Sequence, residues 1–259
     1  SEGMLCSGSE LGLDDQSSGI LELDPHLTPG QKLDEHLQLP DRVFEVELTP
    51  NRGDCLSILG VARETATVTH GTLKEPTIKK IEPKSKETRS ITLDKPDDCP
   101  RYVGRVLSGV SPSTRSPDII RERLRRSDVR SVDALVDITN YLMLETGQPM
   151  HAFDNDRLKD GIVVRRAKPS EQLTLLDGQE LTLNKDNLVI ADGSGPIALG
   201  GIKGGASTMI SEQTSSLFLE AASFNPDCIA RTARQLSINS DAAHRFERGV
   251  DFNLPALAI

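Results

Sequence analysis

The sequence has no tryptophan, and aromatic residues make up only 3% of its 259 residues. A core must therefore be built from Leu, Ile, Val and Ala, and platforms of aromatic side chains that stack on single-stranded bases are not expected. An excess of basic charge is also missing, because the formal net charge is -9 at pH 7. Broad tracking of nucleic-acid phosphates needs clustered Lys and Arg. Any nucleic-acid contact should therefore be local.

Paired cysteines and long apolar runs are missing too. No C-x-x-C motif occurs, so the sequence predicts neither a metal site nor a disulfide framework and favours a reducing, cytoplasmic environment. No run approaches the roughly 18 apolar residues of a membrane-spanning helix, so no membrane contact is expected. The chain starts with Ser1-Glu2-Gly3 rather than Met and has no signal-type start, which indicates an internal fragment of a longer protein.

Common catalytic motifs are absent as well. The sequence contains no G-x-S-x-G elbow, no G-x-x-x-x-G-K-[ST] loop, no H-E-x-x-H pair and no G-x-G-x-x-G after a strand. These absences argue against a hydrolase with a serine nucleophile, a P-loop nucleotidase, a zinc protease and a dehydrogenase. Any chemistry must come from a less familiar arrangement.

The N-terminal part predicts a small lobe. Its first forty residues are rich in turn formers and should have little regular structure. Val43–Leu48 has the composition of a strand, and Asp54 is a plausible N-cap for a helix that runs to about His70 and stops at Gly71. The region 72–88 is rich in Lys and Pro, which oppose both helix and core strand, so we place a domain boundary there.

The remainder mixes strands and helices without the regular alternation of a doubly wound sheet. We therefore predict an α+β fold, with a mixed, mainly antiparallel sheet, flanking helices and a small N-terminal strand-turn-helix lobe. Helices should start at Ser116-Pro117, Ser131, Asn225-Pro226 and Ser240-Asp241. Strands are expected at 89–94, 101–107, 161–167, 172–176, 181–183, 188–191, 197–199 and 216–222, with a hairpin across Asp177-Gly178.

Polar groups and glycines form local clusters that a plain core does not require. His151 follows a Pro-containing turn, where a loop histidine can exchange protons near neutral pH or can simply serve as a structural hydrogen-bonding group. The segment Gly200-Gly201-Ile202-Lys203-Gly204-Gly205 follows an apolar strand, and its paired glycines permit close backbone approach to a ligand or else form a wide turn or bulge. Glu220 interrupts an apolar strand, so it either points outward or has a polar partner in a pocket.

Charged residues gather on two predicted helices. One group could neutralise a few phosphates or could be a solvated helix face. Its members are Arg115, Arg121, Arg123, Arg125, Arg126 and Arg130. The other group, at 240–251, carries charges of both signs and is typical of a surface helix with many salt bridges.

Four segments in this order are far more specific than any of them alone. They are LTPNRGDCLS at 48–57, DITNY at 137–141, GQPMHAFD at 147–154 and HRFERGVD at 244–251. Together they resemble the beta subunits of bacterial phenylalanyl-tRNA synthetases, and the match extends over essentially the whole chain. The opening GMLCS at 3–7 is similar to the segment at which those subunits leave their N-terminal OB-fold.

The resemblance implies a domain organisation and a set of partners. Residues 1–80 would be the end of the OB-fold and part of the N-terminal lobe, and 81–259 would be the editing module, which deacylates mischarged tRNA. The full enzyme would be a cytoplasmic heterotetramer of two alpha and two beta subunits that uses ATP and magnesium. This fragment would need no cofactor and would neither activate phenylalanine nor bind ATP.

The editing pocket of the family can be carried over onto matching positions. The residues implied as catalytic are His151, Asn140, Gly200 and Gly201, and those implied as substrate-binding are Arg130, Thr139, Glu220, Ser240 and Ala242. Two positions depart from the family pattern: Gly200, where Ala is common, and Lys203, where an apolar residue is common. The first departure would widen the pocket and the second would alter its rim.

The implied reaction is the hydrolysis of tRNA(Phe) that has been mischarged with tyrosine. Glu220 would accept a hydrogen bond from the phenolic OH as a charged group, because a site built for a hydroxyl rejects the analogue that lacks it. A positioned water would attack the aminoacyl ester at the tRNA 3' end. His151 and Asn140 would orient water or the terminal ribose, and the Gly200-Gly201 backbone would stabilise the oxyanion. Tryptophan at Ala242 or Gly201 should fill this pocket.

Two other interpretations remain open from the sequence. The chain could be a non-catalytic module for tRNA docking or for the interface between alpha and beta subunits, with its polar clusters serving architecture. Alternatively, it could be a free-standing hydrolase of other aminoacyl esters. A deacylation assay on preformed Tyr-tRNA(Phe) separates the editing function from the docking function.

Overall fold

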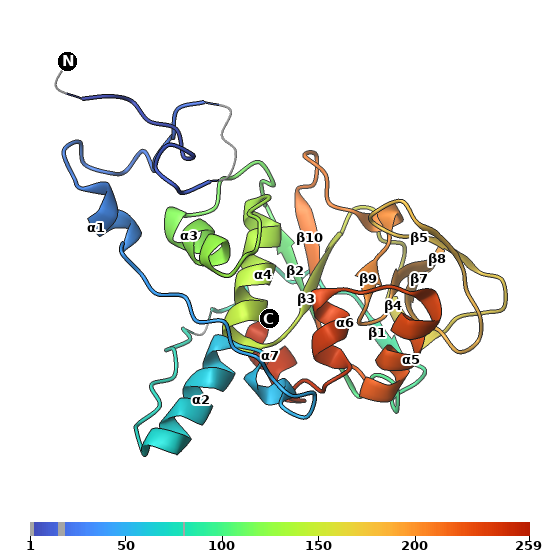
Figure 1. The fold of residues 1–259 in the computed structure, drawn as a ribbon. Coiled ribbons are helices and arrows are strands. Elements are labelled where there is room, and N and C mark those ends of the chain that lie inside the picture. The colour runs from blue at the N-terminus through green and yellow to red at the C-terminus, as the bar shows by residue number, and fades with distance from the viewer. Residues whose placement is uncertain (1–2, 15–18, 80) are drawn as a thin grey trace.

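The computed structural model describes residues 3–14, 19–79 and 81–259 (Figure 1). Ser1 and Glu2, from which we predicted an internal fragment, lie outside the described residues, as does Lys80 in the predicted linker. The described part has an α+β fold, as the sequence predicted, with its strands distributed over three sheets rather than one.

The N-terminal residues have little regular structure, as their turn formers predicted. The short helix α1 (Leu33–Leu37) is attached to the rest of the molecule by Arg126, which donates hydrogen bonds to the backbone carbonyl of Leu37 and to Asp41. Arg115 likewise donates to the Glu22 carbonyl at 2.7 Å. These two arginines therefore fasten the N-terminal residues to the helical layer, which is a structural role.

The strand predicted over Val43–Leu48 is wrong. This segment pairs with no described strand, and its Phe44 side chain is 81% exposed. An extended segment becomes a strand only when a neighbouring strand supplies hydrogen bonds for its backbone. The lobe is therefore a turn followed by a helix.

Helix α2 (Ile58–Thr69) begins three residues later than predicted, because its N-cap is Ser57 and not Asp54. Ser57 is the N-cap, because its Oγ accepts a hydrogen bond from the Gly60 N–H at 3.0 Å, whereas Asp54 pairs with Arg52. A short 3-10 helix, η1 (Gly53–Cys55), precedes the cap. The predicted end is confirmed, since His70 closes the helix with a φ of 54°. No helix or strand lies in the described residues of 72–88.

A three-stranded antiparallel sheet forms the centre of the molecule, in the order β2-β10-β3. Its strands are β2 (Arg101–Ser108), β10 (Ser216–Ser223) and β3 (Met150–Asp154). Strand β3 was not predicted, because we expected His151 to lie in a loop. Met150–Asp154 is extended here because β10 lies beside it and supplies hydrogen bonds for its backbone.

A five-stranded sheet lies on one side of this centre, in the order β1-β4-β7-β8-β9 (Figure 1). Only β1 and β4 run parallel, so the sheet is mixed and mainly antiparallel, as predicted. The hairpin predicted across Asp177-Gly178 is confirmed as β5-β6, with Gly178 at a φ of 85°. The bounds are β1 (Ile91–Leu93), β4 (Ile162–Arg166), β5 (Gln172–Thr174), β6 (Glu180–Thr182), β7 (Leu188–Asp192), β8 (Gly195–Leu199) and β9 (Lys203–Gly204), with a 3-10 turn, η2 (Ala206–Thr208), after β9.

Helices cover the other sides of the sheets. α3 (Asp118–Arg126) and α4 (Ala134–Thr146) lie beside the three-stranded sheet, and α5 (Pro226–Leu236) and α6 (Asp241–Phe246) lie near the five-stranded one (Figure 1). A final short helix, α7 (Leu254–Ala258), was not predicted and contacts β10 and β2. The predicted starts at Pro117, Asn225 and Ser240 are confirmed, whereas α4 is capped by Asp133 instead of Ser131.

One continuous core joins the two larger sheets to α5 and α6. The inner face of the three-stranded sheet contributes Phe153 and Phe218, and the five-stranded sheet contributes Ile190 and Leu199, all of them at most 1% exposed. Because successive side chains of a strand point to opposite faces, Glu220 lies on the same face of β10 as Phe218. The fold thus directs a carboxyl group into the apolar space between the sheets.

Candidate functional site

Two ionisable side chains meet on the inner face of the three-stranded sheet. Glu220 of β10 and His151 of β3 are directly opposite each other in the antiparallel register. Gln148 fixes this alignment, because its buried side-chain amide donates to the carbonyls of Pro149 at 2.8 Å and Ala222 at 2.9 Å. The start of β3 is thereby tied to the end of β10, and both groups face the same apolar space.

Glu220 is 6% exposed and has a polar partner in the pocket, which answers one question left open by the sequence. The phenolic OH of Tyr102, on β2, donates a hydrogen bond to its Oε2 at 3.1 Å. Burial raises the pKa of Glu220 to about 8, because an apolar environment disfavours the charged form, while the Tyr102 hydrogen bond lowers it. Burial therefore favours the protonated, neutral form of this carboxyl group near neutral pH.

His151 lies on strand β3 and is half-buried, rather than exposed in a loop. Its ring lies edge to face with Phe153 at a centroid distance of 4.5 Å, and burial lowers its pKa to about 4. The imidazole is therefore neutral at physiological pH, so one ring nitrogen is a donor and the other an acceptor. A neutral imidazole can orient water or a ribose hydroxyl through either nitrogen.

Three glycines near the site differ in how much space their surroundings leave for a side chain. A Cβ on Gly200 would make ordinary contacts with Leu188 at 3.4 Å. A Cβ on Gly201 would lie 2.8 Å from both Ile229 and Phe224, and its φ is 69°. The expectation that Gly201→Trp fills the pocket is therefore wrong, because the new side chain would enter the core.

The third glycine, Gly204 on β9, is the one against which the histidine packs. A Cβ at this position would lie 2.4 Å from Cε1 and 2.5 Å from Nε2 of His151. Only a glycine lets the backbone approach the imidazole this closely. Gly204 belongs to the glycine cluster identified in the sequence, but its contact with His151 was not predicted.

Helix α6 closes the site from the side. Its N-cap Ser240 accepts a hydrogen bond from the Ala243 N–H at 3.1 Å, and its hydroxyl donates to the Ile202 carbonyl at 2.7 Å. This second bond attaches the start of the helix to the turn before β9. Ala242, on the first turn, then faces the site.

A cavity of about 70 Å³ lies where these elements meet. It is lined by Pro149, Met150, His151, Ile190, Ala198, Leu199, Gly201, Ile202, Lys203, Gly204, Glu220, Ala242 and Phe246. Sites for drug-sized ligands usually enclose about 300–1,000 Å³. The cavity is thus a narrow, mostly apolar slot with polar groups at its wall.

The predicted site residues fall into two sets. His151, Gly201, Glu220 and Ala242 line the cavity, and Gly200 and Ser240 adjoin it. Arg130, Thr139 and Asn140 do not line it. Thr139 and Asn140 lie on α4, which contacts β3, and the Thr139 hydroxyl donates to the Val136 carbonyl of its own helix at 2.9 Å.

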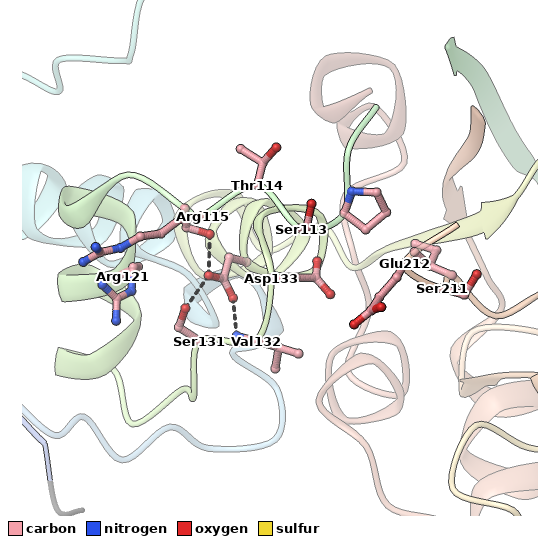
Figure 2. A pocket seen from close by; sticks show the side chains of 13 residues that line it. Ser113, Thr114, Arg115, Arg121, Ser131, Val132, Asp133, Ser211 and Glu212 are labelled. Carbon is pink, nitrogen blue, oxygen red and sulfur yellow. Dashed lines mark hydrogen bonds between the residues drawn. The ribbon is translucent and has the colours of Figure 1, made fainter. Parts of the chain in front are cut away.

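A larger cavity, of about 600 Å³, lies between the starts of α3 and α4 and the segment before β10. Asp137 organises its wall by accepting hydrogen bonds from the hydroxyls of Ser116 and Ser131 and from the Val132 N–H (Figure 2). Figure 2 shows Arg115 and Arg121 across this cavity from Glu212. Both arginines pair with the buried Asp118, so they are structural here.

The described residues hold no group of three or more His, Cys, Asp or Glu side chains that could bind a metal ion. Among the described helices, none combines the length and apolar character needed to cross a bilayer.

The fold and the site together define a class of protein. Residues 98–259 match the model of the B3/4 domain, and the chain therefore belongs to the B3/4 domain family. The particular relatives are beta subunits of phenylalanine–tRNA ligases. The chain is 52% identical to the subunit of Nitrosococcus oceani over 99% of its own length, and 49% identical to those of Hahella chejuensis and Pectobacterium atrosepticum over 100% and 99%. The resemblance predicted from the motifs is thus confirmed.

The chain spans only about a third of the length of these relatives, namely 32%, 33% and 32%. A solved N-terminal fragment of the phenylalanyl-tRNA synthetase beta subunit from Pyrococcus horikoshii is a weaker match. It shares 18% identity and a TM-score of 0.40, covering 76% of this chain and 63% of that fragment. This likeness is too low to add to the argument.

Proposed function

We propose that residues 81–259 form an editing module that hydrolyses Tyr-tRNA(Phe), and that residues 1–80 belong to the preceding OB-fold and N-terminal lobe. The observation that carries this proposal is the juxtaposition of Glu220 and His151 in one apolar slot that α6 closes. A slot with a polar group at its wall is suited to a phenol, and it leaves that group unpaired with phenylalanine. Sites of this kind discriminate by roughly 10⁴-fold or more.

The chemistry follows from the neutral state of both groups. Protonated Glu220 offers Oε1 to the tyrosine hydroxyl while its Oε2 accepts from Tyr102. Neutral His151 orients the attacking water or the terminal ribose. The Gly201 N–H stabilises the oxyanion of the tetrahedral intermediate, because the N–H groups of Gly200 and Ile202 already donate to the Leu188 and Leu199 carbonyls. Arg130, Thr139 and Asn140 hold the tRNA end outside the slot.

The resemblance assigns ATP and magnesium to the full enzyme. The described residues contain no group of three or more His, Cys, Asp or Glu side chains that could hold a metal ion, and the sequence has no P-loop motif. No step of the proposed hydrolysis involves either group. We assign the activation of phenylalanine to the complete cytoplasmic enzyme, a heterotetramer of two alpha and two beta subunits.

Ala242→Trp tests the function in the complete enzyme. Ala242 lines the slot, so an indole at this position blocks the aminoacyl group. Hydrolysis of preformed Tyr-tRNA(Phe) should fall by on the order of 100-fold or more, because the substrate can no longer bind in the slot. Charging with phenylalanine should be retained. Ala256→Trp is the matched control, because Ala256 is an exposed alanine on α7.

Two results would contradict the editing function. If wild-type enzyme leaves Tyr-tRNA(Phe) intact, the module is a docking or interface element. If Ala242→Trp reduces charging as much as hydrolysis, the slot serves synthesis or overall stability.

A further inference from the structure

The carboxyl group of Glu220 has an unequal environment on its two oxygens. Oε2 accepts the Tyr102 hydrogen bond at 3.1 Å, and within the described residues this is the carboxyl group's only hydrogen bond. Oε1 has no hydrogen-bond partner among the described residues and is not fully buried, and Glu220 lines the slot. One oxygen is thus held by the protein and the other is available to a ligand.

The strand register explains why Tyr102 reaches this carboxyl group. Glu220 pairs with Gly104, and Tyr102 pairs with Ala222, so Tyr102 is the diagonal neighbour of Glu220 on the same sheet face. Gly104 has no side chain to intervene, and a Cβ there would lie 2.2 Å from Cζ of Phe218. The Phe218 ring fills that space, which leaves the phenol of Tyr102 as the polar group on the β2 side.

Tyr102 is itself buried, with 8% of its surface exposed, so its position is fixed by packing. Burial and the nearby Glu220 raise the pKa of its phenol well above the ordinary value, and the hydroxyl therefore keeps its proton and donates. With Oε2 engaged by the Tyr102 hydroxyl, Oε1 is the oxygen left to hydrogen-bond a ligand.

We propose that Tyr102 is a positioning residue for hydroxyl recognition, which holds Oε2 of Glu220 so that Oε1 faces the substrate phenol. This inference rests on the proposed function, because it concerns how the same slot selects tyrosine. Tyr102 touches no substrate atom in this scheme. It acts by fixing the rotamer of Glu220.

The test is Tyr102→Phe in the complete enzyme, since phenylalanine keeps the buried ring and removes only the hydroxyl. Losing one neutral hydrogen bond should reduce the preference for Tyr-tRNA(Phe) over Phe-tRNA(Phe) by roughly threefold to tenfold. The change should appear as a higher KM for the tyrosyl ester, with hydrolysis of the phenylalanyl ester unchanged. Charging with phenylalanine reports whether the variant is folded.

Two further variants make the test specific. Tyr141→Phe removes the hydroxyl of the chain's other tyrosine, which lies on α4 and bonds Glu145 and Arg123, and it should leave the preference unchanged. In a Glu220→Ala background, Tyr102→Phe should cause no additional loss of preference, because the group that it positions is gone.

The pH dependence of the preference for the tyrosyl ester is a further measurement, and a purely structural role of Tyr102 would leave it unchanged. Several groups face Glu220: Tyr102 from β2, His151 from β3, the buried Cys99 before β2, and Lys203 on β9, which pairs with Asp177. Of these, the Tyr102 hydrogen bond lowers the pKa of Glu220. Its removal should therefore move the alkaline limb of the tyrosine preference to higher pH.

The outcomes separate this inference from the function on which it rests. Wild-type enzyme that does not hydrolyse Tyr-tRNA(Phe) overturns both. Active wild-type enzyme whose Tyr102→Phe variant keeps its full preference and pH profile overturns the positioning role alone. Equal losses on the tyrosyl and phenylalanyl esters also overturn it, because they indicate a purely structural contribution.

Discussion

At the scale of single residues, the site depends on groups held in their neutral forms. Glu220 has a pKa raised to about 8, and His151 has one lowered to about 4, both because burial disfavours charge. The sequence indicated that Glu220 needs a partner or an outward orientation, since an unpaired charge in an apolar strand is costly. It gave no sign of the partner, because Tyr102 is separated from Glu220 by 118 positions.

Glu220→Gln should make the chain more stable at alkaline pH. Between the ordinary pKa of 4.5 and about 8, the folded protein keeps the Glu220 proton while the unfolded chain loses it, so wild-type stability falls as pH rises. Glutamine has no such proton. The variant's advantage in free energy of unfolding should grow across this window to on the order of 5 kcal/mol, of which about 2 kcal/mol develops above pH 6.5.

Urea titrations between pH 6.5 and 9 measure this difference. His151 contributes little there, because its stabilising effect is lost only as pH falls from 6.5 towards 4. Glu180→Gln, at an exposed position on β6, is the control and should show no pH-dependent advantage. A constant difference between Glu220→Gln and wild type would mean that the carboxyl group is ionised in the folded protein.

At the scale of elements, local sequence signals predicted most strands and helices, and they failed where pairing or capping depended on distant parts of the chain. The hairpin across Asp177-Gly178 and the caps at Asn225 and Ser240 follow from the residues themselves. Val43–Leu48 has strand composition without a described partner strand, and Met150–Asp154 becomes a strand because β10 lies beside it. Strand formation requires both partners.

Ser240→Ala should loosen α6 by removing two hydrogen bonds at its start. The side chain caps the helix at Ala243 and attaches it to the Ile202 carbonyl. Loss of such a cap costs about 0.5–2 kcal/mol. Amide hydrogen exchange at Ala243 should accelerate, and hydrolysis of Tyr-tRNA(Phe) should decrease because Ala242 is no longer fixed at the slot.

The matched variant for this prediction is Ser240→Thr, which keeps the hydroxyl and should restore slow exchange. Unchanged protection of Ala243 in Ser240→Ala would show that packing alone holds the start of α6.

At the scale of the whole molecule, the motifs predicted the family, and the order of strands and helices predicted the α+β class. Neither predicted which candidate residues line the slot and which lie outside it. His151, Gly201, Glu220 and Ala242 come together only through the strand register and the placement of α6. Arg130, Thr139 and Asn140 lie outside the slot, and Gly204 enters it, because these placements are set by tertiary packing. Local patterns carry no information about such distances.

The central claim is that this chain hydrolyses a tyrosyl ester recognised through Glu220. Single-turnover deacylation of Tyr-tRNA(Phe) and Phe-tRNA(Phe) by the complete enzyme, with wild type and Glu220→Ala compared, tests it most directly. A parallel titration with non-hydrolysable tyrosyl and phenylalanyl ester analogues separates affinity from turnover.

Wild type should prefer the tyrosyl ester, and Glu220→Ala should lower this preference about tenfold through weaker binding, as the loss of one buried hydrogen bond implies. A large loss of turnover with unchanged analogue affinity would instead make Glu220 a general base. An unchanged preference in Glu220→Ala, or wild-type enzyme that leaves Tyr-tRNA(Phe) intact, would contradict the claim.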